Sequence, residues 1–216
     1  MTAELSRTPR TPARALVGAL LAFAVAMPIS VAQAVPASAA GFDPSAAEQQ
    51  MANLINQDRA QNGLGPLTFS ARLSQVARGS DISMCGTTVH GRSQDMAERN
   101  YFNHQVPPCN QYVWSALSAA GISFNGAGEN IGWNNYSPQT TSVDRANTSF
   151  MNSSGHRANI LGNFNQVGIG AYMAPGPWNG GSGTQYAGVI LYTEIFINGP
   201  TVDPPPPPPP PPTPQP

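Results

Sequence analysis

The chain has 216 residues and carries ten basic and eleven acidic residues, two cysteines and three histidines. All ten basic residues are arginines and they do not cluster, which argues against nucleic-acid binding. The absence of lysine excludes a Schiff-base mechanism. Without its first 39 residues the chain has seven arginines and ten acidic residues, which gives a net charge of −3.

The first 39 residues have the pattern of an export signal. Three arginines lie between residues 7 and 14, an apolar run follows over 15–26, and Ala-Ser-Ala stands at 37–39. This order predicts a signal peptide over 1–39. An uncleaved membrane anchor is the alternative, although the apolar run is short for a bilayer span.

Residues 40–203 have the length of one domain, and residues 204–216 are a proline-rich tail. Proline fixes φ and lacks an amide donor, so we expect the tail to be a polyproline II spacer outside any core. Within the domain, apolar residues at three- and four-residue spacing, with proline, serine or glycine at the ends, predict helices. They are expected over 44–63, from Ser70 through Met84, around 96–100, over 111–120 and over 137–152.

Strands are predicted mainly in the second half of the domain. Alternating or β-branched residues place them at 129–135, 166–173 and 186–197. We expect the last two to form an antiparallel pair, joined by a glycine-rich, hairpin-like connection. Helices followed by such a pair predict an α+β fold with helices packed on a sheet.

Cys85 and Cys109 are the two cysteines. In an exported chain an even pair predicts a disulfide, which would stabilise the fold by about 3 kcal/mol through chain entropy. Metal binding by this pair is the weaker alternative, because neither cysteine has a partner at C-x-x-C spacing.

Two histidines and one glutamate stand at the ends of predicted elements. His156 follows Ser153 and Ser154, either of which can cap the helix that begins there, and a helix N-terminus disfavours the protonated imidazole. With His104 and Glu129 it makes two imidazoles and one carboxylate, the ligand set of catalytic zinc sites. The spacing alone is weak evidence, since a structural hydrogen-bonded network, or a histidine packed at a turn, would use the same residues.

Four stretches carry a resemblance to a known family: Asn53–Arg59 with Gly63–Leu67, Asp95–His104, Gly128–Ile131 (G-E-N-I), and Ser153–Leu161 (S-x-G-H-R-x-N-I-L). In this order, and over residues 44–197, the chain resembles the CAP superfamily of cysteine-rich secretory, antigen 5 and pathogenesis-related proteins, in its bacterial SCP-like extracellular branch. The resemblance implies a three-layer α-β-α sandwich with a central antiparallel sheet.

The resemblance also implies a cleft with two histidines and two acidic residues, which binds zinc or another divalent metal in some members. His104, Glu129 and His156 match three of these four positions, and Ser153 stands in place of the second acid. Tight metal binding is therefore less expected here than in members with all four. Glu194 is a candidate substitute acid, although a charge on a strand surface is the more ordinary interpretation. His90 lies outside the motifs and is expected in a surface loop.

Three functions are compatible with these features. The favoured one is a secreted module, not an enzyme, whose cleft holds a small apolar ligand or a divalent metal. The second is a metal-assisted hydrolase of peptide or cell-wall material with Glu129 as general base. The third is a structural cell-envelope protein whose site is vestigial and whose tail reaches through the wall. The neutral Ser153 favours the first and third. We expect a secreted, cell-wall-associated monomer whose partner is an apolar molecule or an envelope component.

Overall fold

The computed structural model describes residues 41–107 and 109–203. The predicted signal peptide and the proline-rich tail lie outside the described residues and stay predictions. The elements are α1 (Pro44–Gln61), β1 (Thr68–Phe69), α2 (Ala71–Arg78), β2 (Asp81–Met84), β3 (Thr87–His90), α3 (Ser93–Glu98), α4 (Val113–Ala119), β4 (Gly126–Asn134), α5 (Gln139–Asn152), α6 (Ser154–Ile160), β5 (Gln166–Met173) and β6 (Ile190–Asn198).

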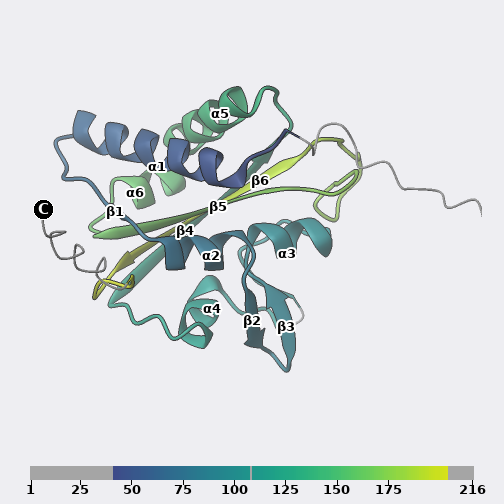
Figure 1. Cartoon of the computed structure of the whole chain (residues 1–216), viewed down its shortest axis with the longest axis horizontal. Coiled ribbons are helices and arrows are strands. Elements are labelled where there is room, and N and C mark those ends of the chain that lie inside the picture. Colours follow the sequence, from purple (N-terminus) through teal and green to yellow (C-terminus); the bar gives the residue numbers. More distant parts are fainter. Residues whose placement is uncertain (1–40, 108, 204–216) are drawn as a thin grey trace, which may run out of the picture. The chain divides into compact units, whose positions relative to one another are not determined.

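The main sheet has four strands in the order β1-β5-β6-β4 (Figure 1). The predicted antiparallel pair of β5 and β6 is confirmed, and β4 pairs antiparallel with the other side of β6. β1 contributes only Thr68 and Phe69 and runs parallel to β5, so the sheet is antiparallel except at this edge.

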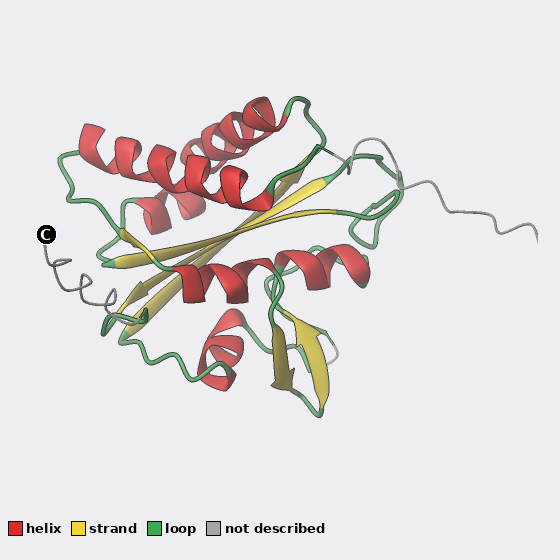
Figure 2. Cartoon of the chain, in the orientation of Figure 1, coloured by secondary structure: helices red, strands yellow, loops and turns green. Residues whose placement is uncertain are grey.

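Helices cover both faces of this sheet, which confirms the α+β, three-layer prediction (Figures 1 and 2). α1, α5 and α6 lie over one face, whereas α2, α3, α4 and the β2–β3 hairpin lie over the other. Successive side chains of a strand point to opposite faces. In β6, Tyr192 and Phe196 therefore join the core under α1 and α5, while Ile195 and Ile197 join the core under α2 and α4.

The predicted second helix is wrong at its C-terminal end. Ser70 caps it as expected, accepting from the amide of Leu73, but the helix stops at Arg78 and the chain continues into the β2–β3 hairpin. Cys85 and Gly86 form the turn with φ of 58° and 71°, the left-handed pair that a two-residue hairpin needs. Met84, assigned to the helix by its spacing, is a strand residue whose side chain is buried.

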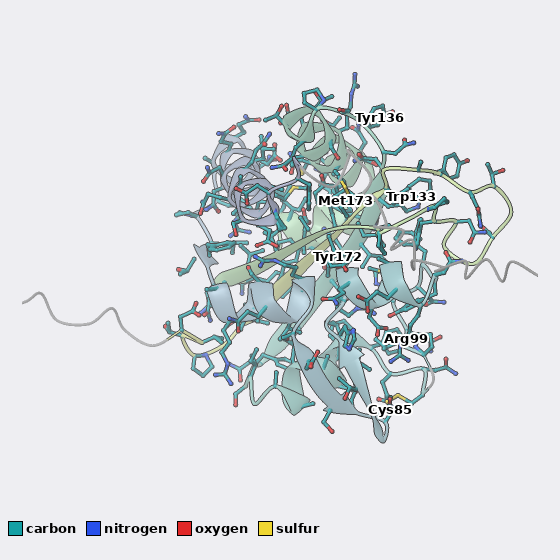
Figure 3. All side chains as sticks on the ribbon, turned by 45° about the vertical axis from the view of Figure 1, so that its right-hand side comes forward. Cys85, Arg99, Trp133, Tyr136, Tyr172 and Met173 are labelled. Carbon is teal, nitrogen blue, oxygen red and sulfur yellow. A yellow bond between two sulfur atoms is a disulfide. The ribbon has the colours of Figure 1, made fainter. Side chains whose placement is uncertain are left out.

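The predicted disulfide between Cys85 and Cys109 is present, with 5.8 Å between the Cα atoms (Figure 3). It ties the hairpin turn to the segment that precedes α4. Across the described part of the chain, no helix has the length and apolarity that a membrane crossing requires.

Candidate functional site

Glu129 lies in β4 opposite Ile195 of β6, so its side chain points to the face covered by α2 and α3. Only 2% of this side chain is exposed. Both carboxylate oxygens are occupied: Oε1 accepts from Nε of Arg92 at 2.6 Å, and Oε2 accepts from Nδ1 of His104 at 2.8 Å. Glu129, the predicted metal ligand and candidate general base, therefore already has Arg92 and His104 as hydrogen-bond partners.

Arg92 is the main residue that the sequence did not point to. It directly precedes α3, is fully buried, and also donates to the Tyr101 hydroxyl (3.0 Å) and to the carbonyl of Asn103 (2.8 Å). Burial opposes its charge, but the pairing with Glu129 outweighs burial and raises the pKa of Arg92. A buried charge needs such a paired, hydrogen-bonded setting. No local pattern separates this arginine from the other six in the domain.

His104 is a partly exposed side chain that bonds the protein through one of its two ring nitrogens. Its Nδ1 bonds Glu129, and 45% of its side chain is exposed. A carboxylate that accepts from Nδ1–H fixes the tautomer and leaves the Nε2 lone pair free for a metal, a ligand or a proton. Glu129 thus orients His104, which is a different task from binding a metal directly.

His156 occupies the third position of α6, and its ring contacts Phe150 of α5 edge-on at 5.1 Å between centroids. Burial lowers the pKa of His156, and the charge of His104 lowers it further. The two imidazoles are therefore within electrostatic reach of each other, and His156 favours the neutral form that binds metals. The sequence predicts the same direction from the positive end of the helix dipole, whereas burial is the main cause in the structure.

The predicted serine cap of α6 is wrong. Ser153 is the N-cap residue, but neither its side chain nor another provides a capping bond. Hydrogen bonds from two asparagine side chains instead fix α6 to β4. Nδ2 of Asn130 donates to the carbonyl of His156 at 3.1 Å, and Nδ2 of Asn159 donates to the carbonyl of Glu129 at 3.2 Å. These two asparagines belong to the G-E-N-I and H-R-x-N-I-L motifs and join them physically.

Two further predictions are wrong: Glu194 is not a strand-surface charge, and His90 does not lie in a loop. Glu194 is neither a surface charge nor a residue on Glu129's side of the sheet, because it is completely buried on the opposite face, opposite Asn130. His90 ends β3 instead of lying in a loop, and its Nδ1 contacts Glu98 of α3 at 2.7 Å.

A cavity of about 530 Å³ lies between β4 and α5. Its lining includes Trp133, Tyr136, Arg145 and Phe150, two of which are labelled in Figure 3. Since Phe150 also contacts the ring of His156, the cavity and the histidine share a wall.

The predicted ligand set fits a metal only in part. Within residues 41–107 and 109–203, no three histidine, cysteine or acidic side chains are grouped so as to hold an ion. Both oxygens of Glu129 already accept hydrogen bonds. The candidate metal ligands that remain are the imidazoles of His104 and His156, and Glu129 orients the first of them by a hydrogen bond.

Solved structures of bacterial surface proteins share this fold. An extracellular protein with an SCP domain from Bacillus anthracis str. Ames is 26% identical, with a TM-score of 0.54 over 72% of this chain and 41% of that one. An outer surface protein of Borrelia burgdorferi has a TM-score of 0.51 at 13% identity, covering 73% of this chain and 96% of its own, and so shares the fold alone.

Two proteins of Bacillus subtilis (strain 168) are similar in sequence. The uncharacterized protein YkwD is 36% identical over 135 residues, which are 62% of this chain and 46% of YkwD. The uncharacterized membrane protein YlbC is 31% identical over 124 residues, 57% of this chain and 31% of YlbC. The chain thus spans less than half the length of either relative.

The profile of the cysteine-rich secretory protein family matches residues 52–192. With the helix–sheet–helix layers, and with the G-E-N-I and H-R-x-N-I-L motifs joined by hydrogen bonds, the chain belongs to this family, CAP, as a bacterial protein of the SCP-like kind.

Proposed function

We propose that this CAP domain is an exported binding module whose working groups are the imidazoles of His104 and His156. The observation that carries the proposal is the hydrogen bond from Nδ1 of His104 to Glu129, which orients the ring of a side chain that is 45% exposed and leaves Nε2 outside this bond. The extracellular SCP-domain protein of Bacillus anthracis supports the expected location outside the cell.

The two imidazoles would hold a divalent metal weakly. Zinc accepts neutral imidazole nitrogens as ligands, but a structural site usually has four protein ligands, and here Ser153 stands where the family has an acid. When bound, zinc would polarise a ligand oxygen. The chain's own contribution is positional: Arg92 fixes Glu129, and Glu129 fixes the ring of His104.

The cavity between β4 and α5 would take a small ligand with an apolar part, since aromatic and polar residues share its lining. Ligand sites in proteins are concave, mostly apolar and of about 300–1,000 Å³. The cavity at β4 and α5 meets that size, and Trp133, Tyr136 and Phe150 supply aromatic walls. Phe150 would link such a ligand to His156, because its ring lines the cavity and contacts the imidazole.

Zinc titration by calorimetry tests the metal part. His156→Ala should abolish binding, and Ser153→Glu should tighten it by restoring an acidic ligand. Binding should weaken as pH falls through the imidazole range, because protonated histidine cannot ligate. The lowered pKa of His156 keeps that ring neutral to a lower pH than a free imidazole.

His90→Ala is the matched control, since it removes the third histidine, which contacts Glu98 instead of the cleft. It should leave zinc affinity unchanged. If His90→Ala reduced affinity as much as His156→Ala, the metal would bind elsewhere and the two-imidazole site would be refuted.

Metal-assisted hydrolysis of peptide or cell-wall material is a second candidate, favoured by the His104–Glu129 pair. A carboxylate-oriented imidazole with a free Nε2 is a suitable general base. The structure thus favours His104 over Glu129 as the base, since both oxygens of Glu129 are occupied. Release of soluble fragments from purified cell walls by the wild type, lost in His104→Ala, would support this candidate. No release from any wall preparation with zinc present would contradict it.

A further inference from the structure

A line of polar side chains crosses the interior beneath α6. Asn159 of α6 donates from Nδ2 to Oδ1 of Asn130 at 2.8 Å, and Asn130 of β4 donates from Nδ2 to Oε2 of Glu194 at 2.7 Å. On the α1–α5 side, Asn147 donates from Nδ2 to Oδ2 of Asp58 at 2.8 Å. Each of these bonds runs in the same direction, from an amide N–H toward an oxygen.

This series of hydrogen bonds is incomplete at two oxygen atoms. Among the described residues, the buried side-chain polar atoms that lack a hydrogen-bond partner are Oδ1 of Asn147 and Oε1 of Glu194. A buried polar atom without a hydrogen-bond partner destabilises the folded protein. Both orphaned atoms are acceptors if Glu194 is ionised, so two unpaired acceptors and a buried charge would coexist in the interior. Asp58 links them, because it bonds Asn147 and its charge reaches Glu194.

The amide orientations are set by partners that can only accept. Asp58 as a carboxylate requires Nδ2 of Asn147 on its side, which turns Oδ1 of Asn147 away from it. The carbonyl of His156 likewise requires Nδ2 of Asn130, whose second hydrogen goes to Oε2 of Glu194. Oε2 is therefore an acceptor, and a proton on Glu194 must reside on Oε1.

We propose that Glu194 is a neutral carboxylic acid in the folded protein at neutral pH, and that its Oε1–H donates to Oδ1 of Asn147. One proton then satisfies both orphaned atoms. It closes a single hydrogen-bond chain that runs from Asn159 through Asn130, Glu194 and Asn147 to Asp58. Hydrogen bonds that point the same way in a low-dielectric interior strengthen one another.

The surroundings of Glu194 favour the neutral form. Burial raises its pKa to about 8, a bond from Asn130 opposes the rise, and the charge of Asp58 in α1 adds to it. The neighbouring strand residues opposite it are Asn130 of β4 and Ile169 of β5, neither of which carries charge. α5 contributes Asn147, and α6 reaches Asn130 through a main-chain carbonyl, although its His156 side chain can carry charge.

The chain makes Glu194 and Asn130 positioning residues for His156. Asn130 can bond the carbonyl of His156 only while its amide keeps this orientation, and Glu194 Oε2 as an acceptor holds it there. Ionising Glu194 would place an unpaired charge under α6. This consequence for ligand binding rests on the proposed function, whereas the protonation state does not.

Carbon-13 NMR of glutamate carboxyl groups, recorded without metal, tests the protonation state. After removal of residues 1–39 the chain has four glutamates, at positions 48, 98, 129 and 194. One carboxyl resonance should titrate between pH 6 and 9, and it should be absent from Glu194→Gln. If every glutamate resonance finished titrating below pH 6, the proposal would be overturned.

Two further variants test the hydrogen-bond partner and the link to His156. Asn147→Leu removes the acceptor and should move the midpoint of that resonance to lower pH, because the neutral acid loses its bond. An unchanged midpoint would refute Asn147 as the partner.

In a nuclear Overhauser experiment, the contact between the His156 and Phe150 rings should persist in Glu194→Gln, whose amide reproduces the acid's donor and acceptor. It should weaken in Glu194→Ala, and equal contacts in both variants would refute the positioning role. If calorimetry detected no zinc binding, the proposed function would be contradicted, whereas the results on the protonation and hydrogen bonding of Glu194 would stand.

Discussion

Two glutamates on neighbouring strands of one sheet are buried in opposite ways. Glu129 of β4 faces the α2–α3 layer, where Arg92 and His104 bond it. Glu194 of β6 faces the α1–α5 layer, where the charge that reaches it is the carboxylate of Asp58. The comparison teaches that burial does not decide the state of a carboxyl group by itself. A buried guanidinium supports an ion, whereas amide neighbours and a second acid favour the neutral acid.

The largest effect is expected from removing the cation on the Glu129 side. Arg92→Met leaves a carboxylate buried without its main partner, and such changes cost about 3–5 kcal/mol of unfolding free energy. Urea denaturation at pH 7 measures this loss. Arg145→Met, at an exposed arginine that stacks on Tyr136, is the matched control and should change stability little. A loss from Arg92→Met as small as the control's would contradict the ion-pair account.

The pH dependence of stability should separate the two glutamates. The pKa of Glu194 is raised, so its contribution is complete below the unfolded value and is lost as pH rises to about 8. Wild type should therefore lose stability relative to Glu194→Gln by about 1.4 kcal/mol per pH unit across that window.

The measurement is the unfolding free energy of wild type, Glu129→Gln and Glu194→Gln at pH 6 and pH 8. Glu129→Gln weakens a bond to a charged group and should destabilise the protein by about 1.5–3 kcal/mol at pH 7. Glu194→Gln should become more stable than wild type as pH rises. Parallel behaviour of both variants would erase the distinction between the two faces.

A smaller loss is expected from Asn130, the amide that serves the Glu194 side. Asn130→Ala strands the carbonyl of His156, the amide of Asn159 and an oxygen of Glu194 together, for a cost of about 2 kcal/mol. Asn152→Ala, at an exposed asparagine near the end of α5, provides the control. Thermal unfolding of both should show a loss for Asn130→Ala alone, and equal midpoints would contradict the network.

The smallest effect belongs to the surface pair of His90 and Glu98. The hydrogen bond to Glu98 raises the pKa of His90, so the pair stabilises the fold at low pH and loses this contribution as pH rises through the raised value. Because both side chains are at least one-third exposed, His90→Gln should cost less than about 0.5 kcal/mol at pH 6 and nothing measurable at pH 8.5. A larger cost that persisted at pH 8.5 would indicate packing instead of charge.

The sequence predicted those features that depend on local pattern or on a family motif. The helix from Pro44, the antiparallel pair of β5 and β6, the disulfide, and the membership of His104 and Glu129 in one site all follow from such signals. Met84 was misplaced because a short run of apolar residues fits both a helix and a strand.

The charged interior could not be predicted, because it depends on strand register and on partners far apart in sequence. Glu194 resembles a solvent-facing charge in an alternating strand, and only the tertiary fold shows that α1 and α5 cover its face of β6. Arg92 is bonded to a residue 37 positions away, and no local spacing records that contact.

The disulfide has a consequence for the timing of site formation. The segment that it closes, from Cys85 to Cys109, contains both Arg92 and His104, the two donors to Glu129. Oxidation therefore restricts the conformations of the very loop that must deliver these donors to β4. While the two cysteines are reduced, the same loop samples more conformations, so Arg92 and His104 are held around Glu129 less firmly until the disulfide forms.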